Sequence, residues 1–183
     1  MEKLDGLEQG DVLFLAGSIP YSMPDDIYRR IMARLEGKGV MIVVDATKDL
    51  LLNVLKYHPF LVKPNHHELG EMFGKTLENE EDIIYYGKKL QEMGARNVLV
   101  SMASKGAILI TEKNTIHKIG VAKGEVKNSV GAGDSMVAGF IAGYLEKADY
   151  GYALKLGTAA GNATAFSDDL ATKEEIENVM LQL

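Results

Sequence analysis

The sequence predicts an α/β fold built on a mostly parallel sheet, because two hydrophobic patterns alternate along the chain. Short runs of consecutive apolar residues are typical of strands buried on both faces, and they alternate with longer segments whose apolar residues recur at helical spacing. Sheets of this kind are covered by helices on both faces. No repeat, low-complexity stretch or change in composition divides the 183 residues. We therefore expect residues 1–183 to form a single domain.

Four apolar runs predict the parallel strands in the first part of the chain. They are Val12–Ala16, Met41–Val44, Phe60–Val62 and Val98–Val100. Helices are predicted between them where apolar residues fall three or four positions apart. These are the segment from Asp25 to Gly37, a short helix carrying Leu51, Leu52 and Leu55, and the segments Asn65–Phe73 and Glu80–Met93.

The second part of the chain predicts a hairpin followed by helices. Two apolar segments, Ala107–Thr111 and Thr115–Ile119, are separated by a short polar turn, as in an antiparallel β-hairpin. Helical spacing then predicts three helices up to the C-terminus. They cover Gly133–Glu146, Tyr150–Phe166 and Thr172–Leu181.

Composition and charge exclude several classes of function. A net charge of −6 argues against nucleic acid or an anionic membrane as the main partner. The chain has no cysteine, which excludes disulfides and thiolate chemistry. No apolar run approaches the roughly 18 residues of a membrane span. Residues 1–5 lack the basic and apolar regions of a signal peptide, so we expect a cytoplasmic protein.

The segment Asn128–Phe140 carries the strongest functional signal. It places Gly131, Ala132, Gly133 and Asp134 where a loop is predicted to enter a helix. Free backbone N–H groups and the helix dipole favour an anion at such a junction. An aspartate beside a bound phosphate can accept a proton during transfer, which indicates phosphoryl transfer rather than simple anion binding. The alternative is an ordinary helix start, with glycines for the turn and the aspartate as an N-terminal charge.

This segment, the stretch Lys63-Pro64-Asn65-His66-His67-Glu68 and their order along the chain resemble the ribokinase-like (PfkB) family of carbohydrate kinases. Within the family, the chain is most similar to members that phosphorylate fructose 1-phosphate to fructose 1,6-bisphosphate. The residues that carry this similarity are those of Asn128–Ser135, Gly157–Gly161 and Leu170–Thr172. The resemblance implies a three-layer α/β/α fold, ATP and Mg²⁺ as cofactors, and a small phosphosugar as substrate. Members acting on tagatose 6-phosphate are the alternative.

The resemblance also implies roles for individual residues. Asp134 would be the catalytic base, and the amides of Gly131, Ala132 and Gly133 would form the anion hole, with Gly133 also on the nucleotide. The pair Asn65 and Glu68 matches a family motif that supports magnesium and phosphate, indirectly through water or phosphate. A capping box explains the same spacing, and the two interpretations are compatible.

The resemblance implies that two further segments contact the nucleotide. Ser101–Gly106 corresponds to a turn where the family often has Ser-x-Gly-x-x-Gly, so Ser101 and Gly106 would face the nucleotide. Ala103 stands at the first glycine position and departs from that pattern. In the last part of Tyr150–Phe166, small residues would offer a flat surface to a purine and Asn162 would meet its edge. Close helix packing is the alternative.

Family members usually carry a further N-terminal part, with a lid and most contacts to the sugar. The resemblance therefore implies that this chain is the nucleotide-binding and catalytic C-terminal part of a sugar kinase. Pairing through the lid would make the full-length protein a homodimer. If translation begins at Met1, the alternative is a nucleotide-binding fragment without catalytic activity.

Overall fold

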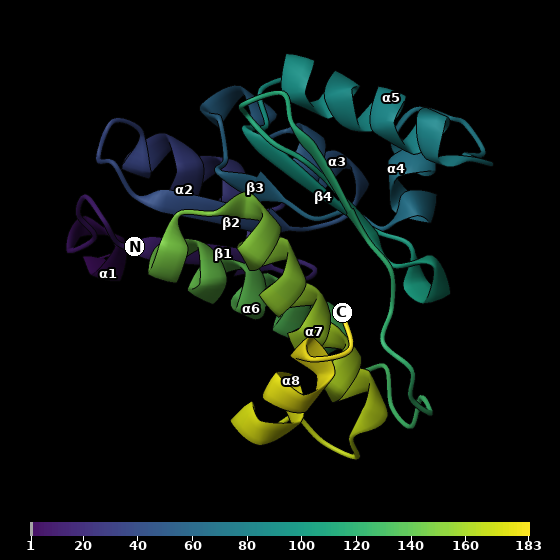
Figure 1. Ribbon diagram of the computed structural model, residues 1–183. Helices are drawn as coiled ribbons and strands as arrows, with labels where there is room; N and C mark the ends of the chain where they lie inside the picture. The colour runs from purple at the N-terminus through teal and green to yellow at the C-terminus, as the bar shows by residue number, and fades with distance from the viewer. Residues whose placement is uncertain (1) are drawn as a thin grey trace. The chain divides into compact units, whose positions relative to one another are not determined.

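The structure, a computed structural model, describes residues 2–183 (Figure 1) and divides into two compact units. Unit 1 comprises Met1–Ser101 and Ile110–Thr115, and unit 2 comprises Met102–Leu109 and Ile116–Leu183. One six-stranded sheet has the strand order β1-β2-β3-β4-β5-β6. The single domain expected from the sequence stays a prediction.

Unit 1 contains the parallel strands β1 (Val12–Ala16), β2 (Met41–Asp45), β3 (Leu61–Val62) and β4 (Asn97–Ser101). Their register pairs Ala16 with Asp45, Val44 with Val62, and Val62 with Val98. Strand β3 is buried throughout, and β2 and β4 are buried except at their ends, as their continuous apolar runs predict. Because all four strands are parallel, the residues at their carboxyl ends meet along one edge.

Helices of unit 1 follow the predicted spacing, with one division. They are α1 (Glu2–Asp5), α2 (Ile27–Leu35), α3 (Lys48–Leu52), α4 (His66–Met72) and α5 (Glu80–Glu92). The predicted helix that carries Leu55 is divided, because Leu55 lies in a separate 3-10 turn, Leu55–Tyr57. Gly87 allows α5 to lie close to the strands, since a side chain there would overlap Ile110.

Unit 2 holds the hairpin arms and the C-terminal helices. The elements are the 3-10 turn Ala103–Lys105, β5 (Ala107–Ile110, whose last residue belongs to unit 1), β6 (Ile116–Ile119), α6 (Ala132–Lys147), α7 (Tyr150–Phe166) and α8 (Lys173–Met180). The strand order places β5 next to β6, so the predicted hairpin is confirmed. Helix α7 has the bounds that the sequence predicts.

Helices α6 and α7 lie side by side, and their glycines explain why (Figure 1). A Cβ at Gly139 would come 2.8 Å from the Cβ of Ala160, and one at Gly157 would come 2.7 Å from the carbonyl oxygen of Met136. Gly161 faces the carbonyl oxygen of Ala132 in the same way, at 3.0 Å. These small residues of α7 serve helix packing, and they are covered by α6 rather than open to a purine.

Thr158 of α7 gives a first prediction about stability. Its side chain is 1% exposed, and its hydroxyl has no hydrogen-bond partner in the described part of the chain. Burying an unsatisfied hydroxyl costs free energy that an apolar side chain of similar shape does not. We expect Thr158→Val to raise the free energy of unfolding by about 1 kcal/mol. Urea denaturation measures it, and a lowered midpoint would contradict the expectation.

Among the helices that the structure describes, none combines the length and the apolar character needed to cross a membrane.

Candidate functional site

The start of α6 in unit 2 has the backbone geometry of an anion site. Gly131 precedes the helix with φ 80° and ψ −9°, a left-handed conformation that glycine adopts without steric cost. The amide of Ala132 donates to Ser129 at 3.3 Å. In contrast, the amides of Gly131, Gly133 and Asp134 find no acceptor among residues 2–183. Three unpaired donors at the positive end of a 16-residue helix favour an anion.

The carboxylate of Asp134 lies in the first turn of the same helix. Its side chain is exposed and forms no hydrogen bond or ion pair within the described residues. An anion held by the three amides would repel this carboxylate unless a hydrogen-bond donor lay between them. The arrangement therefore suits a proton acceptor for a hydroxyl group that approaches a bound phosphoryl group.

The loop ahead of α6 is fixed by the last turn of α7. The amides of Lys127 and Asn128 both donate to the carbonyl oxygen of Ala165, at 2.9 and 3.2 Å. The side chain of Asn128 then accepts from the amide of Val130 at 3.0 Å, which closes the loop before Gly131. The backbone of the predicted anion hole is thus tied to a rigid helix.

A hydroxyl pair makes a second connection between α6 and α7. The hydroxyl of Thr164 donates to Oγ of Ser135, the residue after the predicted base, at 2.9 Å. The same Thr164 oxygen accepts from the amide of Ala171 at 3.3 Å. The sequence predicts neither contact, since neither Thr164 nor Ser135 stands out in the local pattern.

In unit 1, a buried ion pair lies at the carboxyl edge of the strands. Nζ of Lys63, directly after β3, lies 3.0 Å from Oδ2 of Asp45 at the end of β2. The two side chains are 8% and 20% exposed. An ammonium group at this depth needs such a partner, because removing it from water alone is costly. This pair was not among the residues predicted for the site, although a charged residue directly after a buried strand is a usable signal.

Tyr28 contacts the carboxyl end of β1. Its hydroxyl group donates to the carbonyl oxygens of Ala16 at 2.7 Å and Gly17 at 3.0 Å. Burial raises the pKa of the Tyr28 phenol, and the negative charge of Asp45 raises this pKa further. The phenol therefore remains a hydrogen-bond donor at neutral pH, and it holds the end of β1 in place.

Asn65 and Glu68 form the capping box at the start of α4. Oδ1 of Asn65 accepts from the amides of His67 and Glu68, both at 2.9 Å, and Oε2 of Glu68 accepts from the amide of Asn65 at 2.8 Å. Asn65 also forms a parallel bridge with Ser101 at the end of β4. Three predicted site residues therefore lie together in unit 1.

The donor set at this position fits only an indirect contact with magnesium. The capping box occupies Oδ1 of Asn65 and Oε2 of Glu68, which leaves Oε1 of Glu68. In the described part of the chain, no group of three or more His, Cys, Asp and Glu side chains is placed to hold a metal ion. Mg²⁺ keeps several of its waters in protein sites, so one water-mediated carboxylate suits it.

The turn Ser101–Gly106 is tight despite its departure from the family pattern. Within unit 2 the amide of Met102 donates to the carbonyl oxygen of Gly106 at 2.8 Å. The amide of Gly106 donates to the carbonyl oxygen of Ala103 at 3.1 Å. Ala103 adopts φ 49°, the left-handed conformation for which a glycine would be favoured. The nucleotide contacts of Ser101 and Gly106 stay predictions.

Asn162 takes part in a structural contact of unit 2. Its Oδ1 accepts a hydrogen bond from the amide of Ala122 at 2.8 Å, which holds the chain after β6 against α7. The sequence does not reveal this partner, because it lies 40 positions away. The contact of Asn162 with a purine stays a prediction.

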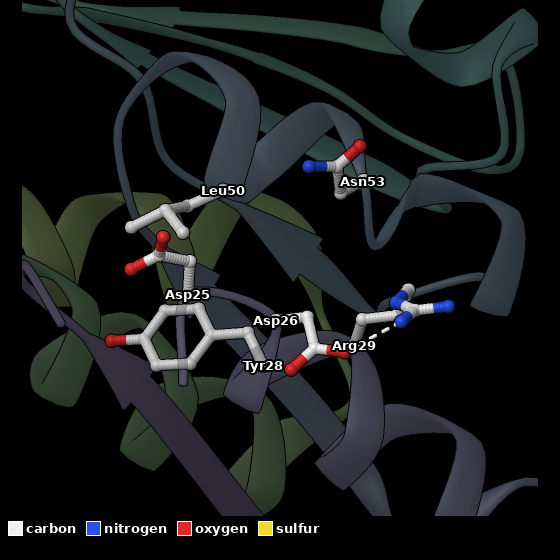
Figure 2. Close-up of a pocket in the computed structure, with 6 residues that line it drawn as sticks. All are labelled: Asp25, Asp26, Tyr28, Arg29, Leu50 and Asn53. Atoms are coloured by element: carbon white, nitrogen blue, oxygen red, sulfur yellow. Dashed lines mark hydrogen bonds and ion pairs between the residues drawn. The ribbon is translucent and has the colours of Figure 1, made fainter. Parts of the chain in front are cut away.

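A separate pocket of about 170 Å³ lies in unit 1 between the start of α2 and α3 (Figure 2). Asp25, Asp26, Tyr28, Arg29, Leu50 and Asn53 line it. Most of its polar groups are already engaged, since Arg29 pairs with Asp26 and the Tyr28 hydroxyl donates to backbone carbonyls. None of the residues predicted to bind substrate or nucleotide lines this pocket.

Known proteins resemble the chain over almost its whole length. The model of the pfkB family carbohydrate kinases matches residues 1–176. The 1-phosphofructokinase of Bacillus subtilis is 45% identical over 180 residues, which cover 98% of this chain and 59% of that protein. The D-tagatose-1-phosphate kinase of Bacillus licheniformis is 35% identical over 184 residues, covering 100% of this chain and 60% of that protein.

Solved structures agree with the fold. A Staphylococcus aureus protein described as a phosphofructokinase superposes with a TM-score of 0.93 at 40% identity, over 99% of this chain and 59% of that one. A ribokinase of Arabidopsis thaliana, with a TM-score of 0.79 and 21% identity over 92% of this chain and 55% of that one, shows the fold alone. The predicted ribokinase-like fold is confirmed. The chain spans about 59% of the length of the relatives that it matches first.

Proposed function

The chain belongs to the pfkB family of carbohydrate kinases, and from this membership we propose that the protein is an ATP-dependent phosphosugar kinase. The proposed substrate is fructose 1-phosphate, whose 6-hydroxyl receives the γ-phosphate of ATP to give fructose 1,6-bisphosphate and ADP. Two relatives named 1-phosphofructokinase, at 45% and 33% identity, support this choice.

The observation that carries the proposal is the start of α6, where unpaired amides and a carboxylate share one helical turn. The 6-hydroxyl oxygen bonds to the γ-phosphorus as the bond from that phosphorus to the leaving oxygen of ADP breaks. Asp134 takes the proton of the hydroxyl group. The unpaired amides of Gly131, Gly133 and Asp134 donate to the oxygens of the transferring phosphoryl group, where negative charge is held in a loose transition state.

Asn65 and Glu68 are the residues proposed to support magnesium. When bound, Mg²⁺ neutralises charge on the phosphates of ATP. The capping box holds Glu68 in one orientation, so that its second carboxylate oxygen can accept from a metal-bound water. Ser101, bridged to Asn65, is proposed to face the triphosphate, and Gly106 and Asn162 to lie on the nucleotide side.

A coupled assay of ADP formation tests the substrate. The protein as its gene encodes it is supplied with MgATP and one of three sugars: fructose 1-phosphate, tagatose 1-phosphate or tagatose 6-phosphate. We expect the highest kcat/KM with fructose 1-phosphate. Tagatose 1-phosphate is the second candidate, because the 35% identical relative is named for it. Use of tagatose 6-phosphate alone would overturn the assignment, since that sugar accepts at its 1-hydroxyl instead.

A nucleotide-binding protein without turnover is the alternative from another class. It predicts that titration calorimetry detects MgATP binding while no sugar phosphate yields ADP. Assembly into a homodimer stays a prediction, which sedimentation of the same protein would test.

A further inference from the structure

The hydroxyl of Thr164 links three segments around the start of α6 through hydrogen bonds. It belongs to the last turn of α7, donates to Ser135 in the first turn of α6, and accepts from Ala171 in the segment before α8. Its side chain is 2% exposed. A buried hydroxyl with both a donor and an acceptor partner holds one orientation.

We propose that Thr164 is a positioning residue for phosphoryl transfer, which rests on the proposed function. Thr164 touches no reacting atom; it acts through Ser135, whose backbone follows directly after Asp134. Holding Ser135 fixes how the first turn of α6 lies on the end of α7. The adjacent carbonyl of Ala165 fixes the loop before Gly131. Thr164 and Ala165, neighbours in the last turn of α7, thus hold the amides at the start of α6 and the carboxylate of Asp134 in fixed positions relative to one another.

The segment before α8 depends on the same hydroxyl. Leu170 in this segment lies against Gly131: a Cβ placed on Gly131 would come 3.1 Å from Cδ2 of Leu170. The amide of Ala171 needs the Thr164 oxygen as its acceptor. Without that oxygen, this segment and the first turn of α6 lose their common anchor. Small displacements of groups that must align with a phosphoryl group reduce turnover strongly.

Thr164→Val removes both hydrogen bonds and keeps the shape of the side chain. Helix α7 offers a matched control, since Thr158 is equally buried and has no partner within the described residues, so Thr158→Val changes the same atoms. With MgATP and fructose 1-phosphate, we expect Thr164→Val to lower kcat by roughly 10- to 100-fold. The KM for ATP should change by less than about 3-fold. Thr164→Ser should restore most of kcat, and Thr158→Val should leave it unchanged.

Amide chemical shifts measured without nucleotide give a readout independent of turnover. We expect Thr164→Val to move the resonances of Gly131 and Gly133 and Thr158→Val to leave them in place. If Thr164→Val does not fold, Ser135→Ala replaces it and removes the same hydrogen bond from the α6 side. A folded variant with unchanged shifts and unchanged kcat overturns the inference. A wild-type protein that neither turns over nor binds MgATP overturns the proposed function and this inference with it.

Discussion

Replacing Asp134 by asparagine is expected to lower kcat by about 10³-fold, within the range by which proton transfer to a positioned side chain contributes to catalysis. Asparagine keeps the size of the side chain and the helix start, but its amide cannot take the proton of the attacking hydroxyl. The KM for ATP should stay within about 3-fold, because the backbone amides at the start of α6 are unaltered. Steady-state kinetics with fructose 1-phosphate as acceptor measures both constants.

Glu146→Gln is the matched control for this experiment. Glu146 lies in the last turns of the same helix, its side chain is 57% exposed, and the substitution removes the same charge. We expect kcat within about 2-fold of the wild type, as for an exposed substitution away from the reacting groups. If Asp134→Asn retained near-normal turnover, Asp134 would be part of the helix start and not the base.

The elements that the sequence predicts best are those with a strong local pattern. Val12–Ala16 and Tyr150–Phe166 have the predicted bounds, because an apolar run or a long helical repeat ends at clear turn or capping residues. Helix α1, Glu2–Asp5, was not predicted, since a single turn is too short to show a helical repeat. The capping box of Asn65 and Glu68 was predicted because it lies within one helical turn.

The candidate site was predictable only where its residues are neighbours in sequence. The proposed anion hole and the proposed base Asp134 lie within one motif, whereas the Thr164 hydroxyl reaches a partner 29 positions away. The ion pair of Lys63 with Asp45 likewise joins the end of β2 to the residue that follows β3. Such partners are set by the register of the sheet and by helix packing, which the local pattern does not contain. Asn162 illustrates this, because its bond to Ala122 depends on where the chain after β6 lies.

Gly106→Ala is expected to lower the free energy of unfolding by about 3 kcal/mol or more, from backbone strain and overpacking together. Gly106 has φ 90° and ψ −138°, a conformation open almost only to glycine. A Cβ there would overlap the carbonyl oxygen of Ile119 in β6, so the backbone itself would have to move. Chemical denaturation of the protein without nucleotide measures the loss.

Gly120→Ala separates this steric effect from the general effect of replacing a glycine. Gly120 follows Ile119 directly, has no positive φ, and a Cβ there would meet nothing within 4 Å. We expect its stability to stay within about 0.5 kcal/mol of the wild type. If Gly106→Ala instead kept wild-type stability but lost MgATP binding, the glycine would be required for the nucleotide alone. Loss of stability without nucleotide would mean that the hairpin already requires a glycine at this position, whether or not the nucleotide contacts it.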